Sequence, residues 1–237
     1  MEISTDEIVA VPGSQEGVAH LGLTLCNPGD VVLLPNPGYP VFEVGAYLGG
    51  AELYFYELRE ENDFLPKFDE IPEDIARRAK YIMVSYPYNP VCAVAPASFY
   101  EELIAYAKKY NIIVVHDNAY SDIIYDGVRG GSFLEFPGAK EVGIECFSLS
   151  KSFNLTGARV SFMIGNREII DAVKLLRSQY DFGIFEPIQR AAIAALEGPL
   201  EPVREQCARY QERRDALCGG LRSIGWDVRD SQGTMFA

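Results

Sequence analysis

The chain has 237 residues, 48% of them apolar, and a formal net charge of −13. That charge argues against nucleic acid or an anionic membrane as a partner, because both require a cationic surface. The five cysteines are scattered without a C-x-x-C pair and the two histidines lack ligand spacing, so neither disulfides nor a metal site is expected. No apolar run is long enough to span a bilayer and no signal-peptide pattern is present, which predicts a cytoplasmic protein.

Short β-branched or aromatic runs alternate with helical segments along most of the chain. Several runs are apolar throughout, which is typical of strands covered on both faces in a parallel sheet. The predicted strands are residues 8–11, 31–34, 53–56, 81–85, 112–116, 144–147 and 160–164. The predicted helices between them are residues 15–25, 39–48, 96–110 and 168–179. This alternation predicts a doubly wound α/β domain.

The pattern becomes helical from Pro187 onward. Residues 188–196 and 203–221 are predicted helices, and residues 226–228 and 233–236 read as the beginnings of new strands. We therefore expect residues 1–200 to form one large domain. Residues 201–237 would form a long linking helix and the incomplete start of a smaller C-terminal domain.

Lys151 is the most informative candidate residue. A strand-like run, residues 143–147, leads to it, Ser148 precedes it by three positions and Arg159 follows eight positions later. A hydroxyl and a guanidinium so placed would suit an amine that forms a Schiff base beside an anchored phosphate. The constellation indicates pyridoxal-phosphate chemistry.

Other polar residues fall where predicted strands end, which is where open α/β sheets bind ligands. Asp117 could pair with a pyridine nitrogen or serve as a helix N-cap, and the residues alone favour neither. Tyr39 could stack on a ring or pack a proline-rich turn, and Asn89 could donate to a phenolate or belong to an ordinary turn. The Ser14-Gln15 turn opens a helix that suits a phosphate, although simple capping is the commoner role of such residues.

Taken together, these segments resemble the fold-type I pyridoxal-phosphate enzymes, in particular the class I/II aminotransferases, from about residue 8 to the end of the chain. Residues 148–159 are the most specific segment and are similar to that family's lysine signature. Residues 28–30, 36–40, 89–90 and 117–120 match further family blocks in the same order. Each match is modest, but their joint occurrence leaves little room for coincidence.

The resemblance implies the large domain of that fold, a three-layer arrangement with a mostly parallel sheet between helices. It implies that Lys151 is the Schiff-base lysine and general base, that Asp117 pairs with the pyridinium, and that Tyr120 belongs with them to the catalytic set. The implied cofactor is pyridoxal 5'-phosphate. The residues that would bind it are Ser14, Gln15, Tyr39, Asn89, Asp117, Tyr120, Ser148, Lys151 and Arg159.

Two departures from the family pattern accompany this resemblance. Tyr88 and the Val91-Cys92 pair stand where relatives carry Asn and Thr-Gly, and losing that glycine restricts the loop backbone. The family's carboxylate-binding arginine and its N-terminal closing segment also lie outside this sequence. These departures predict a protein that binds the cofactor with impaired transamination.

The resemblance further implies amino acid and 2-oxo acid substrates and a homodimer with sites at the subunit interface. Residues 13–17 and 178–185 are similar to aspartate and LL-diaminopimelate aminotransferases. Three alternatives stay open: a carbon–sulfur β-lyase of the same fold, a non-catalytic sensor module that binds the cofactor, and a shortened product without activity. The sensor module ranks lower, because the chain is acidic and lacks a basic DNA-binding segment.

Overall fold

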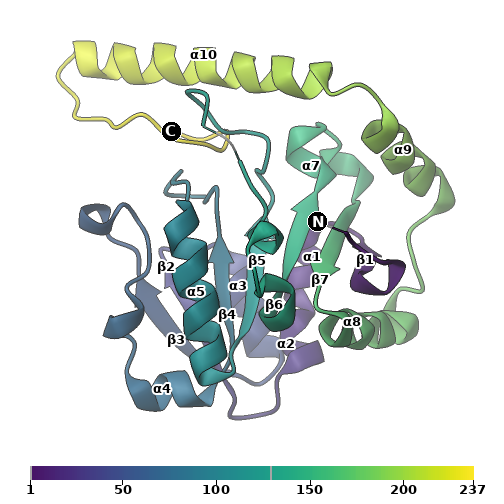
Figure 1. Ribbon diagram of the computed structural model, residues 1–237. Helices are drawn as coiled ribbons and strands as arrows, with labels where there is room; N and C mark the ends of the chain where they lie inside the picture. The colour runs from purple at the N-terminus through teal and green to yellow at the C-terminus, as the bar shows by residue number, and fades with distance from the viewer. Residues whose placement is uncertain (1, 129) are drawn as a thin grey trace.

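Seven strands form a single mixed sheet in the computed structural model, which describes residues 2–128 and 130–237 (Figure 1). The strand order across the sheet is β1-β7-β6-β5-β4-β2-β3. The strands are β1 (Ile8–Val11), β2 (Val31–Asn36), β3 (Glu52–Glu57), β4 (Ala79–Ser85), β5 (Ile113–Asn118), β6 (Gly143–Ser148) and β7 (Ser161–Gly165). Each lies within two residues of a strand predicted from apolar runs, and the α/β fold is confirmed.

Strand direction determines which chain segments meet at one edge of the sheet. The pairs β2/β3, β2/β4, β4/β5 and β5/β6 are parallel, whereas β7 is antiparallel to both β6 and β1. The carboxyl ends of six strands and the amino end of β7 therefore lie at the same edge. In open α/β sheets this is the edge that binds ligands.

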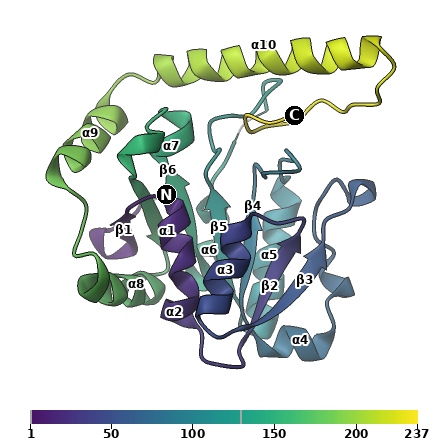
Figure 2. The same ribbon diagram turned by 180° about the vertical axis from the view of Figure 1, so that it is seen from behind.

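Helices cover both faces of the sheet (Figures 1 and 2). One face carries α4 (Glu73–Arg78), α5 (Ala97–Tyr110) and α6 (Ala139–Val142), and the other carries α1 (Ser14–Ala19), α2 (Leu21–Leu25) and α3 (Pro40–Leu48). Helix α8 (Arg167–Tyr180) contacts α2, β1 and β7, and the short α7 (Leu149–Ser152) follows β6. Single 3-10 turns occur at Thr5–Glu7, Glu60–Asn62, Phe68–Glu70, Phe133–Glu135 and Thr156–Ala158.

The core forms where the apolar stripe of α5 meets the central strands. Phe99, Leu103 and Ala107 recur at helical spacing and are buried against β4 and β5, whose central residues are also buried. Leu103 has no exposed surface. Replacing it with Ala would cost about 2–5 kcal/mol of stability, because the lost contacts leave a cavity.

Two predictions from local pattern are wrong. The predicted helix 15–25 is divided into α1 and α2 at His20. The division lies next to Gly22, where an added Cβ would overlap the carbonyl oxygen of Gly45 in α3, and this close helix contact cannot be read from one-dimensional periodicity. Residues 226–228 form no strand, because no strand within residues 2–128 and 130–237 pairs with them, and Gly233 makes only an isolated bridge to Ile124.

Helices α9 (Glu186–Glu197) and α10 (Glu201–Ser223) lead away from the sheet, and α10 then crosses above its ligand-binding edge (Figure 1). The C-terminal segment returns between α10 and the sheet. There it packs with α10 on an apolar cluster of Tyr120, Ile123 and Tyr125. The domain boundary predicted at residue 200 stays a prediction, although α10 does begin at Glu201.

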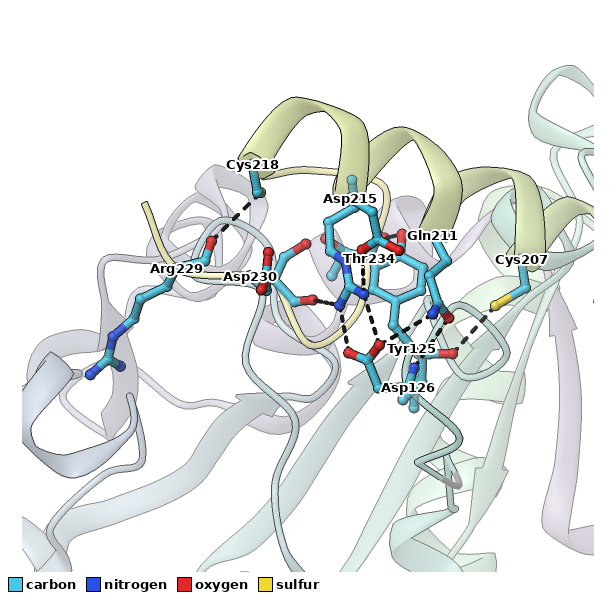
Figure 3. A network of polar contacts seen from close by, with 12 residues as sticks. Tyr125, Asp126, Cys207, Gln211, Asp215, Cys218, Arg229, Asp230 and Thr234 are labelled. Carbon is cyan, nitrogen blue, oxygen red and sulfur yellow. Dashed lines mark hydrogen bonds and ion pairs between the residues drawn. The ribbon is translucent and has the colours of Figure 1, made fainter. Parts of the chain in front are cut away.

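Arg214 of α10 fastens the C-terminal segment to the loop after β5. Its guanidinium donates to both carboxylate oxygens of Asp126, at 2.6 and 2.8 Å, and to the backbone oxygen of Ser231 at 2.9 Å. It also lies over the ring of Tyr125, 4.9 Å from the centroid, and pairs with Asp215. Figure 3 shows Asp126 and Tyr125 beneath α10 with Thr234 beside them, and Asp215 on α10 itself. A buried arginine thus joins three segments that are distant in sequence.

Candidate active site

A cavity of about 770 Å³ opens at the carboxyl edge of the sheet. The structure brings all nine sequence-predicted site residues to its lining: Ser14, Gln15, Tyr39, Asn89, Asp117, Tyr120, Ser148, Lys151 and Arg159. The sheet topology explains the convergence, because β1, β2, β4, β5 and β6 end at this edge and antiparallel β7 begins there. The segment between β6 and β7 supplies two charged groups of the lining, Lys151 and Arg159.

The backbone around Lys151 is fixed on several sides. Ser148 is the N-cap of α7, and its Oγ accepts a hydrogen bond from the Ser150 amide at 3.1 Å and from the Ser161 hydroxyl at 2.9 Å. The carbonyl of Lys151 accepts from the Gln206 side chain of α10 at 2.9 Å. These bonds hold the main chain, while the half-buried side chain lines the cavity. Capping and tertiary contacts together therefore set where the amine is delivered.

Asp117 offers an anionic group without a partner. It lies on β5 directly opposite Ser85 of β4, whose hydroxyl donates to the Asp117 backbone oxygen at 2.8 Å. Its Oδ1 is buried and makes no hydrogen bond. Burial raises the pKa of the Asp117 carboxyl to about 6, against which the charge of His116 lowers it. A buried carboxylate oxygen without a hydrogen-bond donor is costly, so this position suits a cationic donor from a ligand.

Two phenols and an amide line the cavity near Asp117. Burial raises the pKa of Tyr120 to about 12, and a side-chain hydrogen bond with Asn89 acts in the opposite direction. The hydroxyl of Tyr39 donates to Gln15 Oε1 at 3.2 Å, and its ring meets Phe42 edge to face at 5.9 Å. Tyr120 therefore stays protonated at neutral pH and can donate a hydrogen bond into the cavity.

Gly13 and Arg159 shape the part of the cavity that suits an anion. Gly13 is the N-cap of α1 and has φ +92°, in the region that favours glycine. A Cβ built there would overlap the guanidinium of Arg159, coming within 2.8 Å of its Cζ. Arg159 Nη1 donates to the Thr156 carbonyl at 2.9 Å, which orients the group. The amides of Ser14 and Gln15 lie in the first turn of α1 and have no partner within the helix, so they can bind an anion beside this cation.

The loop that departs from the family pattern keeps a glycine-like backbone. Cys92 has φ +57°, the left-handed conformation, and its amide donates to the Tyr88 carbonyl at 2.5 Å. Its buried thiol accepts from the Thr234 hydroxyl at 3.3 Å. Tyr88 is buried as well and donates to the Pro37 carbonyl at 2.8 Å. Tertiary contacts thus impose the turn on a residue that disfavours it, and Asn89 stays at the cavity.

Sequence reasoning did not single out Ser85, Ser150, Thr156 or Phe236, which also line the cavity. Ser85 carries the same signal as Asp117, since a polar residue ends an apolar strand there. Ser150 lies two residues after Ser148 and directly before Lys151, so both serines are close to the lysine in sequence. Phe236, whose ring lies 6.3 Å from that of Tyr120, left no local signal because its position depends on how α10 returns the chain.

Some chemistries find no support in the described part of the chain. Among residues 2–128 and 130–237, no three His, Cys, Asp or Glu side chains cluster so that they could hold a metal ion. The five cysteines are unpaired, three buried and two half-buried. No helix in these ranges combines the length and apolarity needed to cross a bilayer.

Comparison with known proteins places this arrangement in a family. The family model for aminotransferases of class I and II matches residues 1–237. An LL-diaminopimelate aminotransferase of Moorella thermoacetica is 47% identical over 230 residues, 97% of this chain and 59% of that protein. The corresponding enzyme of Halothermothrix orenii is 48% identical over the same share of each chain. The chain therefore spans about three fifths of the length of these relatives.

Solved structures give the same result. The apo BacF structure from a Bacillus species superposes with a TM-score of 0.96 at 39% identity, covering 99% of this chain and 60% of that one. A probable N-succinyldiaminopimelate aminotransferase from Thermus thermophilus superposes with a TM-score of 0.87 at 38% identity, over 92% and 58% of the two chains. The predicted large-domain fold of this family is confirmed.

Proposed function

We propose, from the premise that this chain belongs to the class I and II aminotransferase family, that it binds pyridoxal 5'-phosphate in the cavity at the carboxyl edge of the sheet. Its reaction would be the transfer of an amino group between an amino acid and a 2-oxo acid. The observation that carries the proposal is the convergence of Lys151, Asp117 and Arg159 on one cavity, with Gly13 packed against Arg159. These groups offer an amine, a partnerless anion and an anion cradle to a single ligand.

The residues present fit this cofactor. Asp117 Oδ1, buried without a hydrogen bond, would accept from the protonated ring nitrogen. Asn89 and Tyr120 would donate to the phenolic oxygen, and Tyr39 would cover one face of the ring. Ser14, Gln15, Ser148 and Arg159 would hold the phosphate, with the bare Cα of Gly13 allowing close approach.

When bound, the cofactor supplies an electron sink that stabilises negative charge at the substrate's α-carbon. The protein's own contribution is placement and proton transfer. Lys151 would hold the cofactor's aldehyde and, once its amine is free, take up the proton from the α-carbon as general base. Asp117 would keep the proton on the ring nitrogen, because its Oδ1 is buried and accepts no hydrogen bond from the protein.

Two finer points belong to the same proposal. The relatives named above support LL-diaminopimelate as the first amino donor to test.

Three exposed apolar side chains on α3 support burial of this surface in a homodimer: Val44, Tyr47 and Leu48. Val44 also borders the cavity. Light scattering at several concentrations would measure the oligomeric state. The relatives above whose names state an activity are aminotransferases, which supports this reaction over the lyase and sensor alternatives. The cytoplasmic location stays a prediction.

Visible absorption spectroscopy of the purified protein tests the proposal. We expect a cofactor band in the wild-type protein that changes when LL-diaminopimelate is added. Lys151→Ala should lose this band, and borohydride followed by peptide mapping should place the cofactor on the peptide that contains Lys151. Lys174→Ala is the matched control, because Lys174 lies outside the cavity and binds the Thr5 and Asp6 carbonyls. A band that survives in Lys151→Ala, or an adduct on another peptide, would refute the assignment.

A further inference from the structure

A buried histidine and glutamate face each other on the side of the sheet away from the cavity. His116 of β5 and Glu145 of β6 are directly paired in the sheet register, and His116 Nδ1 lies 2.9 Å from Glu145 Oε2. His116 is 0% exposed and Glu145 is 4% exposed. Neither residue lines the cavity, and the proposed reaction does not use them.

The surroundings hold this pair in one arrangement. Glu145 Oε2 also accepts the Phe133 amide at 2.8 Å, and Oε1 accepts the Asn118 side-chain amide at 3.2 Å. His116 Nε2 lies 3.4 Å from the Tyr100 hydroxyl of α5. Apolar residues of similar volume are often at least as stabilising as a buried pair of this kind. Stability alone therefore does not explain why this polar network occupies the core here.

The position of the network relative to Asp117 supplies an explanation. Asp117 is the next residue on β5, so its side chain leaves the opposite face of the same strand, toward the cavity. Burial raises the pKa of Asp117, the charge of His116 lowers it and the charge of Glu145 raises it. The two members of the pair thus act on the same carboxyl with opposite signs through a low-dielectric interior.

Three other titratable groups that act on Asp117 or lie near it carry no charge at neutral pH. Burial raises the pKa of Tyr120 to about 12 and holds those of Tyr88 and Cys146 above their usual range, so all three stay neutral. Lys151 and Arg159 line the cavity and are the same in every variant considered below. The His116–Glu145 pair is consequently the charge source behind Asp117 that substitution can change without altering the cavity.

We propose that the buried His116–Glu145 pair is a positioning unit for the active site, which sets the ionisation of Asp117 from the far face of β5. The role deepens the proposed function and rests on it, since an ionised Asp117 is what would hold the proton on the cofactor's ring nitrogen. Glu145 fixes the imidazole, and the imidazole offsets the negative charge that Glu145 places behind Asp117.

Titration of Asp117 in the cofactor-free protein tests this role. Carbon-13 NMR of protein labelled at aspartate carboxyls would follow the midpoint, with Asp117→Asn identifying the signal. Glu145→Gln should lower the midpoint, because it removes the charge that opposes ionisation. His116→Asn, whose amide can replace Nδ1 toward Glu145, should raise it. Tyr100→Phe is the uncharged control that removes the contact at Nε2 and should leave the midpoint in place.

The opposite signs separate this role from a purely structural one. Both single variants can lose stability, but equal shifts in one direction, or no shift in either, would overturn the proposal. The double variant should return the midpoint toward that of the wild type. It carries the test together with Glu145→Gln if His116→Asn fails to fold. The titration needs no cofactor, so failure of the wild-type protein to bind pyridoxal 5'-phosphate would sink the proposed function separately.

A second readout uses the cofactor itself. Affinity for pyridoxal 5'-phosphate, measured by fluorescence at pH 6, should fall in His116→Asn and rise in Glu145→Gln, because pH 6 is close to the Asp117 midpoint of the wild-type protein. Affinities that change in the same direction in both variants would contradict the role.

Discussion

Gly13 and Arg159 lie so close together that no side chain larger than hydrogen fits between them. A Cβ on Gly13 would overlap the guanidinium, and the backbone there has φ +92°. The first strand-to-helix turn and the start of β7 therefore meet across a contact that only glycine permits. This contact is the basis of the proposed phosphate site.

Gly13→Ala should displace Arg159 and weaken pyridoxal 5'-phosphate binding by about tenfold or more, since one charge-assisted contact is lost. It should also cost about 1–2 kcal/mol of stability from backbone strain. Gly29→Ala is the matched control, because Gly29 has the same φ of +92° but nothing within 4 Å of its added Cβ. Equal affinities in the two variants would count against a phosphate site at Gly13 and Arg159. Fluorescence titration and urea denaturation give the two quantities.

Asp117→Asn should stabilise the cofactor-free protein at pH 7.5 by about 1–3 kcal/mol, because the buried carboxyl ionises at a cost. Its pKa is raised from 3.8 to about 6 on folding. The folded state therefore binds the proton more tightly, and the wild-type protein loses stability as pH rises from about 4 to 6. Below about pH 4 the two proteins should have equal stability. Denaturation curves that run parallel across this window would remove the desolvation argument.

Cys92→Gly should be more stable than Cys92→Ala by about 1 kcal/mol, because position 92 has φ +57° and alanine retains the Cβ that disfavours it. Both variants lose the thiol contact with Thr234, so their difference isolates the backbone. Chemical denaturation of the pair measures it. An alanine variant as stable as the glycine variant would show that the loop relaxes out of the left-handed conformation.

Arg214→Met should cost about 2 kcal/mol, because several charge-assisted hydrogen bonds are lost from a buried position. Limited proteolysis should then cut residues 224–232, which the arginine ties down. Arg213→Met is the control on the same helix. Its exposed side chain lies over Tyr210 at 5.7 Å, and the effect of the substitution should stay within about 0.5 kcal/mol. Comparable protease sensitivity in both variants would show that Arg214 does not hold the C-terminal segment in place.

The ion pair between Arg214 and Asp126 should contribute to stability in a pH-dependent way. The Arg214 guanidinium holds the pKa of Asp126 below its usual value of 3.8. The contribution of this pair is therefore fully present above about pH 4 and is lost as pH falls through the lower folded-state pKa. The wild-type protein should resist proteolysis of residues 224–232 near pH 5 and lose that resistance on further acidification, whereas Arg214→Met should be cleaved at both values.

The strands were predictable from sequence, as was the set of residues that line the cavity, because both leave local signals. An apolar run that ends in a polar residue, as at Asp117, predicts both a buried strand and a polar group at the sheet edge where that strand ends. The positions of Phe236 and of residues 226–228 were not predictable, since they depend on the return of α10 across the sheet and on Arg214. The division at His20 and the left-handed Cys92 likewise follow from tertiary contacts, which periodicity does not encode.

Ser148 and Ser161 are direct partners in the antiparallel ladder of β6 and β7, and their hydroxyls are hydrogen-bonded at 2.9 Å. This pairing and hydrogen bond fix both ends of the segment between them, residues 149–160, relative to each other. An insertion or deletion there could not be absorbed by sliding either strand, since a slip of one residue would turn every side chain to the other face. A change of length would therefore have to be taken up within residues 149–160, the segment that carries Lys151 and Arg159 to the cavity.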